Sequence, residues 1–293
     1  MKNSKKEIWL DANKKPAKYS GNPNSHKSPG STRDGLSGQD KRAAGKYRFA
    51  TIRENYEDYS SGRVFYGAPG ATGFPIRLVS EIFQRCVARL REKGVPPRYT
   101  LYDPCCGGGY SAAVTGYLHG GQISKIYASD ISSEAIELAR RNLSLLQPEG
   151  LNQRIREIRS LIKEFNKQSH LDALESSLHL KRQLESLERP IRIECFQFDI
   201  LGNRDVSQEI EKVHLVMTDV PYGRVTNWHG LTDNADPTQR LLTNIRAVLT
   251  PSSVVAITTT QKRAAHYAGF HRLEEMKIGK RRILIFEMTE PRV

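Results

Sequence analysis

Short apolar runs alternate with segments of helical periodicity along this chain. Strand-like runs occupy residues 99–102, 125–129, 193–198 and 213–217, and a β-branched run follows at 254–258. Between them, residues 111–118, 131–143 and 241–249 are expected to be helical, the last closed by Thr250 and Pro251. This alternation predicts an α/β fold with a doubly wound, Rossmann-like sheet.

Further segments flank this alternation. Residues 78–90 predict a lead-in helix with one apolar face, whose arginines (Arg77, Arg85, Arg89 and Arg91) are expected on a solvated face. Residues 276–286 predict two closing antiparallel strands. Residues 147–190 read as an inserted helical hairpin with its turn at 166–170, because Ile155, Ile158 and Ile162 recur at helical spacing.

Composition points to a polyanionic partner. The chain has 45 Lys and Arg against 32 Asp and Glu, a net charge of +13. Such a balance is typical of a protein that meets phosphate. The four cysteines lack metal-ligand or disulfide spacing, so no metal is expected and a reducing cytoplasm fits. No run of about 18 apolar residues could span a membrane.

A polar segment precedes the predicted domain. Residues 1–46 are rich in Lys, Ser, Asn, Gly and Pro, and are expected to form a disordered basic extension. It could contact RNA phosphates or serve only as a solubilising arm.

A glycine loop, DPCCGGGY at residues 103–110, follows the first strand-like run. Its glycines let the backbone approach either a dinucleotide or S-adenosylmethionine closely, although Ala112 replaces the third glycine of the dinucleotide fingerprint. Asp130 stands where an acid would reach a ribose. Singly, an aspartate at such a position is more often a cap or turn residue. Four of them follow strand-like runs and should share one ligand-binding rim: Asp103, Asp130, Asp199 and Asp219.

The segment TDVPYG at residues 218–223 carries the candidate chemistry. An ordinary strand exit would also use Asp, Pro and Gly. Alternatively, Asp219 meets the N–H groups of a planar base, Pro221 fixes the backbone, and Tyr222 offers a stacking face.

Together with SEIFQR (80–85), ASDI (128–131) and KIGKR (277–281), these two segments resemble the avilamycin-resistance methyltransferase family, the AviRa-like enzymes, from about residue 47 onward. Serine is expected in the family where Gly108 stands. The resemblance implies a class I S-adenosylmethionine-dependent methyltransferase domain over residues 47–293. It implies transfer to a guanine of 23S rRNA in the large ribosomal subunit, with resistance to orthosomycin antibiotics. The cofactor-binding residues are then expected to be Asp103, Cys105, Gly107, Gly109, Asp130, Ile131, Asp199, Ile200 and Asp219.

The expected catalytic residues are Asp219, Pro221 and Tyr222. Asp219 would accept the proton of guanine N1 during methyl transfer, and Tyr222 would stack on the base. Modification of an exocyclic amine, N2 of guanine or the adenine amine, in RNA or DNA would use the same residues. The glycine loop and Asp130 alone would also allow a nicotinamide-dependent oxidoreductase, and a non-catalytic RNA-binding protein of Rossmann shape is the other rival.

RNA contacts are expected outside the catalytic loop. For the hairpin, the alternative to RNA contact is that its residues only pack the two helices together. After the catalytic loop, His229 could assist proton transfer, but a single histidine in a loop is more often a surface residue. The expected RNA-binding residues are Arg154, Arg156, Arg159, Trp228, Lys280 and Arg281.

Overall fold

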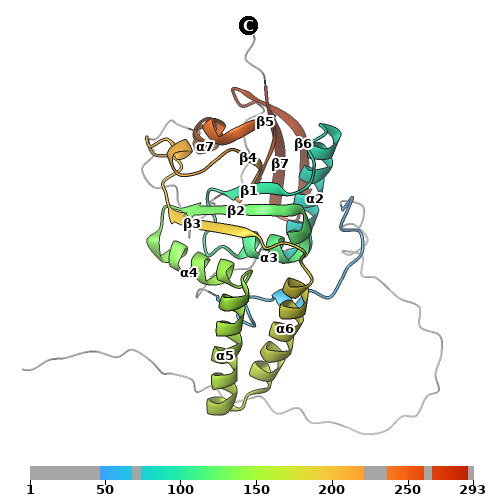
Figure 1. Ribbon diagram of the computed structural model, residues 1–293. Helices are drawn as coiled ribbons and strands as arrows, with labels where there is room; N and C mark the ends of the chain where they lie inside the picture. Colours follow the sequence, from blue (N-terminus) through green and yellow to red (C-terminus); the bar gives the residue numbers. More distant parts are fainter. Residues whose placement is uncertain (1–46, 68–73, 221–235, 261–265, 290–293) are drawn as a thin grey trace, which may run out of the picture. The chain divides into compact units, whose positions relative to one another are not determined.

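The computed structural model describes residues 47–67, 74–220, 236–260 and 266–289. These described residues form a seven-stranded sheet in the order β3-β2-β1-β4-β5-β7-β6 (Figure 1). β1 to β5 are parallel, whereas β7 runs antiparallel to both β5 and β6. The strands are β1 Tyr99–Asp103, β2 Ile123–Asp130, β3 Arg192–Gln197, β4 Val213–Asp219, β5 Leu249–Thr259, β6 Phe270–Ile278 and β7 Arg281–Met288.

Helices cover both faces of this sheet, which confirms the predicted α/β class. One core lies between the sheet and the helices α2 (Ile76–Glu92), α3 (Tyr110–His119) and α4 (Ser133–Ser144). A second core, on the opposite face, lies beneath α7 (Pro237–Ile245). Short 3₁₀ turns connect the elements: η1 Glu57–Tyr59, η2 Gly120–Gln122, η3 Val206–Gln208 and η4 Arg246–Val248.

The predicted helical insertion is present as α5 (Pro148–Phe165) and α6 (Gln168–Glu185), which leave the sheet side by side (Figure 1). Its turn is shorter than expected, because Asn166 adopts a left-handed conformation (φ 44°) and α6 starts at Gln168. Ile155 and Ile158 are buried near the base, but Phe165 at the far end is 48% exposed. The apolar stripe is therefore core at the base and surface at the tip.

The expected helix over 241–249 is wrong at both ends. α7 begins at Pro237, because the Asp236 carboxylate accepts a hydrogen bond from the Thr238 amide (2.8 Å) and proline suits the first helical turn. The helix ends at Ile245, and β5 already begins at Leu249. β5 therefore includes Thr250 and Pro251, which had been expected only to end the helix.

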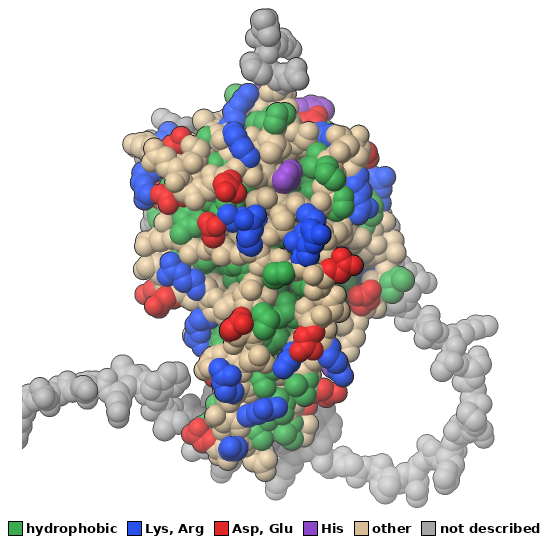
Figure 2. All heavy atoms as spheres, in the orientation of Figure 1, with side chains coloured by type: hydrophobic (Ala, Val, Ile, Leu, Met, Phe, Trp, Pro, Cys, Tyr) green, Lys and Arg blue, Asp and Glu red, His purple; other side chains and the backbone are tan. Residues whose placement is uncertain are grey.

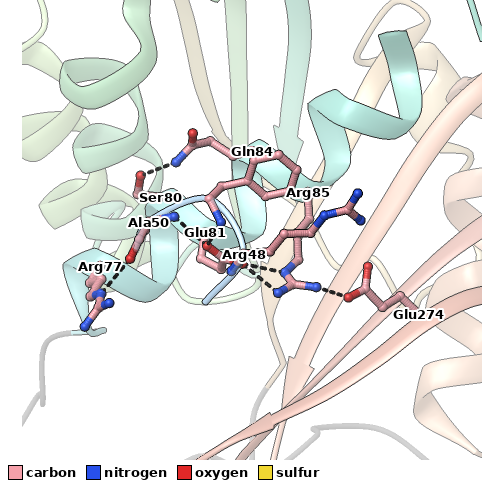
Figure 3. A network of polar contacts seen from close by, with 9 residues as sticks. Arg48, Ala50, Arg77, Ser80, Glu81, Gln84, Arg85 and Glu274 are labelled. Carbon is pink, nitrogen blue, oxygen red and sulfur yellow. Dashed lines mark hydrogen bonds and ion pairs between the residues drawn. The ribbon is translucent and has the colours of Figure 1, made fainter. Parts of the chain in front are cut away.

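A buried carboxylate fastens the segment before α2 (Figure 3). Glu81, on α2, accepts hydrogen bonds from the backbone N–H groups of Arg48 (2.6 Å), Phe49 (2.9 Å) and Ala50 (2.7 Å). Burial alone would raise the pKa of Glu81, but these N–H groups and the Arg85 charge outweigh it and lower the pKa. The side chain is completely buried, so its charge is held entirely by these partners.

Two of the arginines expected on a solvated face are engaged in this network instead. Arg85 is 8% exposed and pairs with Glu81 on its own helix and with Glu274 on β6 (Figure 3). Arg77 donates to the Ala50 and Thr51 carbonyls. The expected solvated face is therefore wrong for Arg85, because the helical pattern could not show that another part of the chain packs against it.

Candidate active site

The glycine loop between β1 and α3 packs directly on α4. Gly109 has φ +71°, and a Cβ there would stand 2.9 Å from the Ala139 Cα. Only glycine meets both conditions. Gly108, where the family resemblance led us to expect serine, would direct its Cβ to 2.7 Å from the flexible end of Leu138. The absence of a side chain at both positions keeps the loop close to α4.

Asp130, at the end of β2, holds the loop from the other side. Its Oδ2 accepts from the Gly107 amide (2.9 Å) and its Oδ1 from the Ser132 amide (3.0 Å). Each carboxylate oxygen has a further lone pair, so Asp130 can still accept from ribose hydroxyls. Ile131 follows with 41% of its surface exposed. This loop, carboxylate and exposed apolar side chain fit the nucleoside part of S-adenosylmethionine.

A buried amide supports the loop from below. Asn142 of α4 donates to the Gly108 carbonyl (2.8 Å) and to the Tyr66 carbonyl (3.0 Å), and accepts from the Tyr66 amide (2.8 Å). It is 1% exposed, so its bonds are made within the protein. The cofactor loop and the segment before α2 are thus joined through one side chain.

A pocket opens where β1 and β4 end, at the point where the strand order changes direction. Ligands of doubly wound sheets bind at such a point. Asp103 and Asp219, from adjacent strands, both line the pocket, and α2 closes its side. The described residues that line it are Phe74, Val79, Ile82, Asp103, Ser111, Met217, Thr218, Asp219, Ala256 and Thr258.

The Asp103 carboxyl is 4% exposed, and its burial raises its pKa to about 7. The nearby Thr218 hydroxyl and the Cys105 amide, which donates a hydrogen bond to Asp103, act in the opposite direction. The charges of Asp130 and Asp219 raise the pKa further. The pocket therefore contains an acid that exchanges its proton near neutral pH beside a second carboxylate, an arrangement suited to proton transfer.

The loop after β3 lies apart from this pocket lining. Asp199 is exposed, and its Oδ1 accepts from the Leu201 amide (2.9 Å), which fixes the turn. Ile200 is 4% exposed and belongs to the second core. In the glycine loop after β1, the Cys105 amide donates a hydrogen bond to Asp103 Oδ1 (3.3 Å). Each of these three expected cofactor residues thus also has a local structural role.

The predicted RNA-binding residues of the hairpin separate into two kinds. Arg154 donates to the carbonyls of Val64 (2.8 Å) and Arg63 (3.4 Å), pairs with Glu157, and lies over the Tyr66 ring. Only 13% of its side chain is exposed, so its donors serve the fold. Arg156 and Arg159 are exposed.

The remaining predicted residues stand elsewhere. Lys280 is exposed and Arg281 half-buried, at the turn between β6 and β7. Pro221, Tyr222, Trp228, His229 and the extension at 1–46 lie outside the described residues.

Several residues that line the pocket or support its glycine loop were not predicted from the sequence. Thr258 ends a predicted strand and Ser111 opens a predicted helix beside the glycine loop, so their positions alone could have suggested them. Phe74 and Asn142 carry no such signal, since one lies between elements and the other within a helix.

The sheet order, the glycine loop braced by an acid at the end of β2, and the carboxylate pocket at the β1–β4 switch point define a class I S-adenosylmethionine-dependent methyltransferase. The family model described as rRNA methyltransferase AviRa matches residues 45–281. The chain belongs to this family.

Similar proteins agree with this assignment. The 23S rRNA (guanine(2535)-N(1))-methyltransferase of Streptomyces viridochromogenes is 36% identical over 246 residues, 83% of this chain and 96% of that protein. Two crystal structures of rRNA methyltransferase AviRa from the same organism have TM-scores of 0.73 and 0.74, at 35% and 34% identity. Each covers 82% of this chain, and the matches span 95% and 96% of those chains.

No helix among the described residues is long and apolar enough to cross a membrane. No group of three or more His, Cys, Asp or Glu side chains in the same residues could hold a metal ion.

Proposed function

We propose that this enzyme methylates a guanine of 23S rRNA, at N1, and thereby gives resistance to orthosomycin antibiotics. The observation that carries the proposal is the pair of carboxylates, Asp103 and Asp219, in the pocket beside the glycine loop. The Streptomyces relative, named for N1 methylation of a 23S rRNA guanine, supports the choice of base and atom.

Methyl transfer to guanine N1 requires that the neutral base lose a proton. Guanine N1 carries a proton and is a poor nucleophile until the proton is removed. S-adenosylmethionine supplies a methyl group on a sulfonium. As the N1–CH₃ bond forms and the S–CH₃ bond breaks, the N1 proton passes to the Asp219 carboxylate. General-base assistance of this kind contributes about 10²–10⁴-fold, and positioning of base and methyl supplies more.

The other residues have supporting roles in the proposal. Asp130 and Ile131 hold the ribose and adenine side of the cofactor, and Gly107 and Gly109 allow its close approach. Asp199 and Ile200 border it from the β3 loop, with Cys105 and Asp103 on the β1 side. Pro221 and Tyr222 position the base by backbone rigidity and stacking.

RNA is held mainly by positive charge. Lys and Arg side chains are interspersed with acidic ones over the hairpin (Figure 2). Arg156 and Arg159 are the proposed phosphate contacts there, and Lys280 and Trp228 are proposed as further RNA contacts. A cytoplasmic location is part of the proposal, and an rRNA substrate supports it.

Two substitutions test the division of roles. Asp219→Asn should abolish methyl transfer to a 23S rRNA transcript and leave S-adenosylmethionine affinity, measured by calorimetry, near the wild-type value. Asp130→Asn should weaken cofactor binding first. Equal loss of cofactor affinity in both variants would refute the assignment.

A further inference from the structure

Arg281 shares a face of the sheet with the candidate catalytic carboxylate. Asp219 pairs with Thr258 across β4 and β5, and Thr258 pairs with Ile283 across β5 and β7. Residues two apart on a strand point to the same side. Arg281 therefore lies on the side of Ile283, one step nearer the rim where the pocket opens.

The Arg281 guanidinium stands over a pocket residue. Its central carbon lies 5.1 Å from the centre of the Phe74 ring, and Phe74 lines the pocket that contains Asp219. The Arg281 Nε is buried, and no acceptor among the described residues is hydrogen-bonded to it. A buried N–H without an acceptor costs free energy, which a bound ligand could recover.

The neighbouring arginine differs in this respect. Arg282 points to the opposite face of β7 and forms an ion pair with Glu275 of β6. Two consecutive arginines of the same strand thus have different surroundings: one is engaged within the sheet, and the other is stacked beside the pocket.

We propose that Arg281 donates a hydrogen bond to O6 of the target guanine, next to the N1–H group that Asp219 engages. The proposal rests on the proposed function. Removal of the N1 proton places negative charge on O6 through the ring amide, and a fixed guanidinium stabilises that charge as it develops. Adenine has an amino donor at the same position, so the two donors would repel each other. Arg281 is then both a catalytic and a specificity residue.

A phosphate contact, expected from the sequence alone, gives a different kinetic signature. Loss of a phosphate contact weakens RNA binding and lowers the slope of log affinity against log salt by about 0.7–0.9. Loss of a contact to developing charge on O6 lowers kcat and leaves both RNA affinity and salt slope unchanged.

The experiment measures methyl transfer to an unmodified 23S rRNA transcript by Arg281→Ala, Arg281→Lys and the control Arg282→Ala. We expect kcat to fall about 10²–10³-fold in Arg281→Ala, with KM for RNA and its salt dependence unchanged. Arg281→Lys, which keeps the charge and a donor, should recover part of the loss. Arg282→Ala should keep the wild-type kcat. Calorimetric binding of S-adenosylmethionine verifies that each variant is folded.

Two results would overturn the assignment. A raised KM with a reduced salt slope and unchanged kcat would make Arg281 a phosphate contact, and wild-type kinetics in Arg281→Ala would remove it from the site. Either result leaves the proposed function intact. Wild-type enzyme that transfers no methyl group to 23S rRNA would refute the proposed function and this assignment with it.

Discussion

The buried acid Asp103 should make stability depend on pH. Its pKa is raised from 3.8 to about 7 in the folded protein. Between these values the folded state retains a proton that the unfolded state has lost, so stability falls as pH rises from about 4 to 7. Asp103→Asn removes this dependence. The variant should therefore gain stability relative to wild type as the pH rises from 5 to 8, by up to about 3 kcal/mol.

Chemical denaturation of both proteins at pH 5 and pH 8, without cofactor, measures this gain. Parallel pH profiles for the two proteins would show that Asp103 does not titrate in this range.

Gly109 should tolerate no side chain. Its φ of +71° and the approach of Ala139 to 2.9 Å from a Cβ both oppose Gly109→Ala. We expect a loss of more than about 1 kcal/mol in stability, together with weaker S-adenosylmethionine binding, measured by calorimetry. Gly121→Ala is the matched control, because a Cβ there meets nothing within 4 Å. Equal effects at the two positions would contradict the role assigned to Gly109.

At the scale of elements, Glu81 should fasten the segment before α2 more strongly than a surface ion pair could. Glu81→Gln leaves a charged Arg85 and several buried N–H groups with a poorer acceptor, and should cost about 3–5 kcal/mol. Hydrogen exchange should accelerate at Arg48, Phe49 and Ala50. Glu92→Gln, which removes an exposed pair with Arg89 on the same helix, should cost under about 1 kcal/mol. Unchanged exchange at residues 48–50 in Glu81→Gln would contradict this account.

The apolar pattern predicted the elements better than their boundaries or partners. Buried strands such as β1 and β4 are continuous apolar runs, so periodicity alone located them. The start of α7 depended on the Asp236 cap, and the start of β5 on pairing of Leu249 with Val213, a contact between distant segments. The same limit explains Arg85 and Arg154: helical spacing located them on their helices, but Glu274 and Val64, to which they donate, are 189 and 90 residues away in the sequence.

The candidate site could also be predicted from the sequence only in part. Acids at strand ends could be predicted because the carboxyl ends of parallel strands share one rim, and Asp103 and Asp219 do line one pocket. Phe74 and Asn142 reach the site through tertiary packing, which no local pattern encodes.

At the scale of the whole molecule, some arginines of the hairpin should bind RNA, whereas others should stabilise the fold. Arg156→Ala and Arg159→Ala should each lower the salt slope of 23S rRNA binding by about 0.7–0.9 and leave thermal stability unchanged. Arg154→Ala should instead lower the melting temperature, since its guanidinium holds the Val64 and Arg63 carbonyls. Filter binding over a salt series, with thermal unfolding in parallel, separates the two classes. An Arg154 variant with wild-type stability and a reduced slope would reverse the assignment.

The central claim is that the pocket of Asp103 and Asp219 methylates N1 of a guanine in 23S rRNA. Mass spectrometry of nuclease fragments, after incubation of the transcript with S-adenosylmethionine, reports the nucleotide and the methylated atom together. The account predicts one N1-methylguanosine with wild-type enzyme and none with Asp219→Asn. A methyl group on an exocyclic amine or on another base, or an unchanged yield with Asp219→Asn, would contradict it.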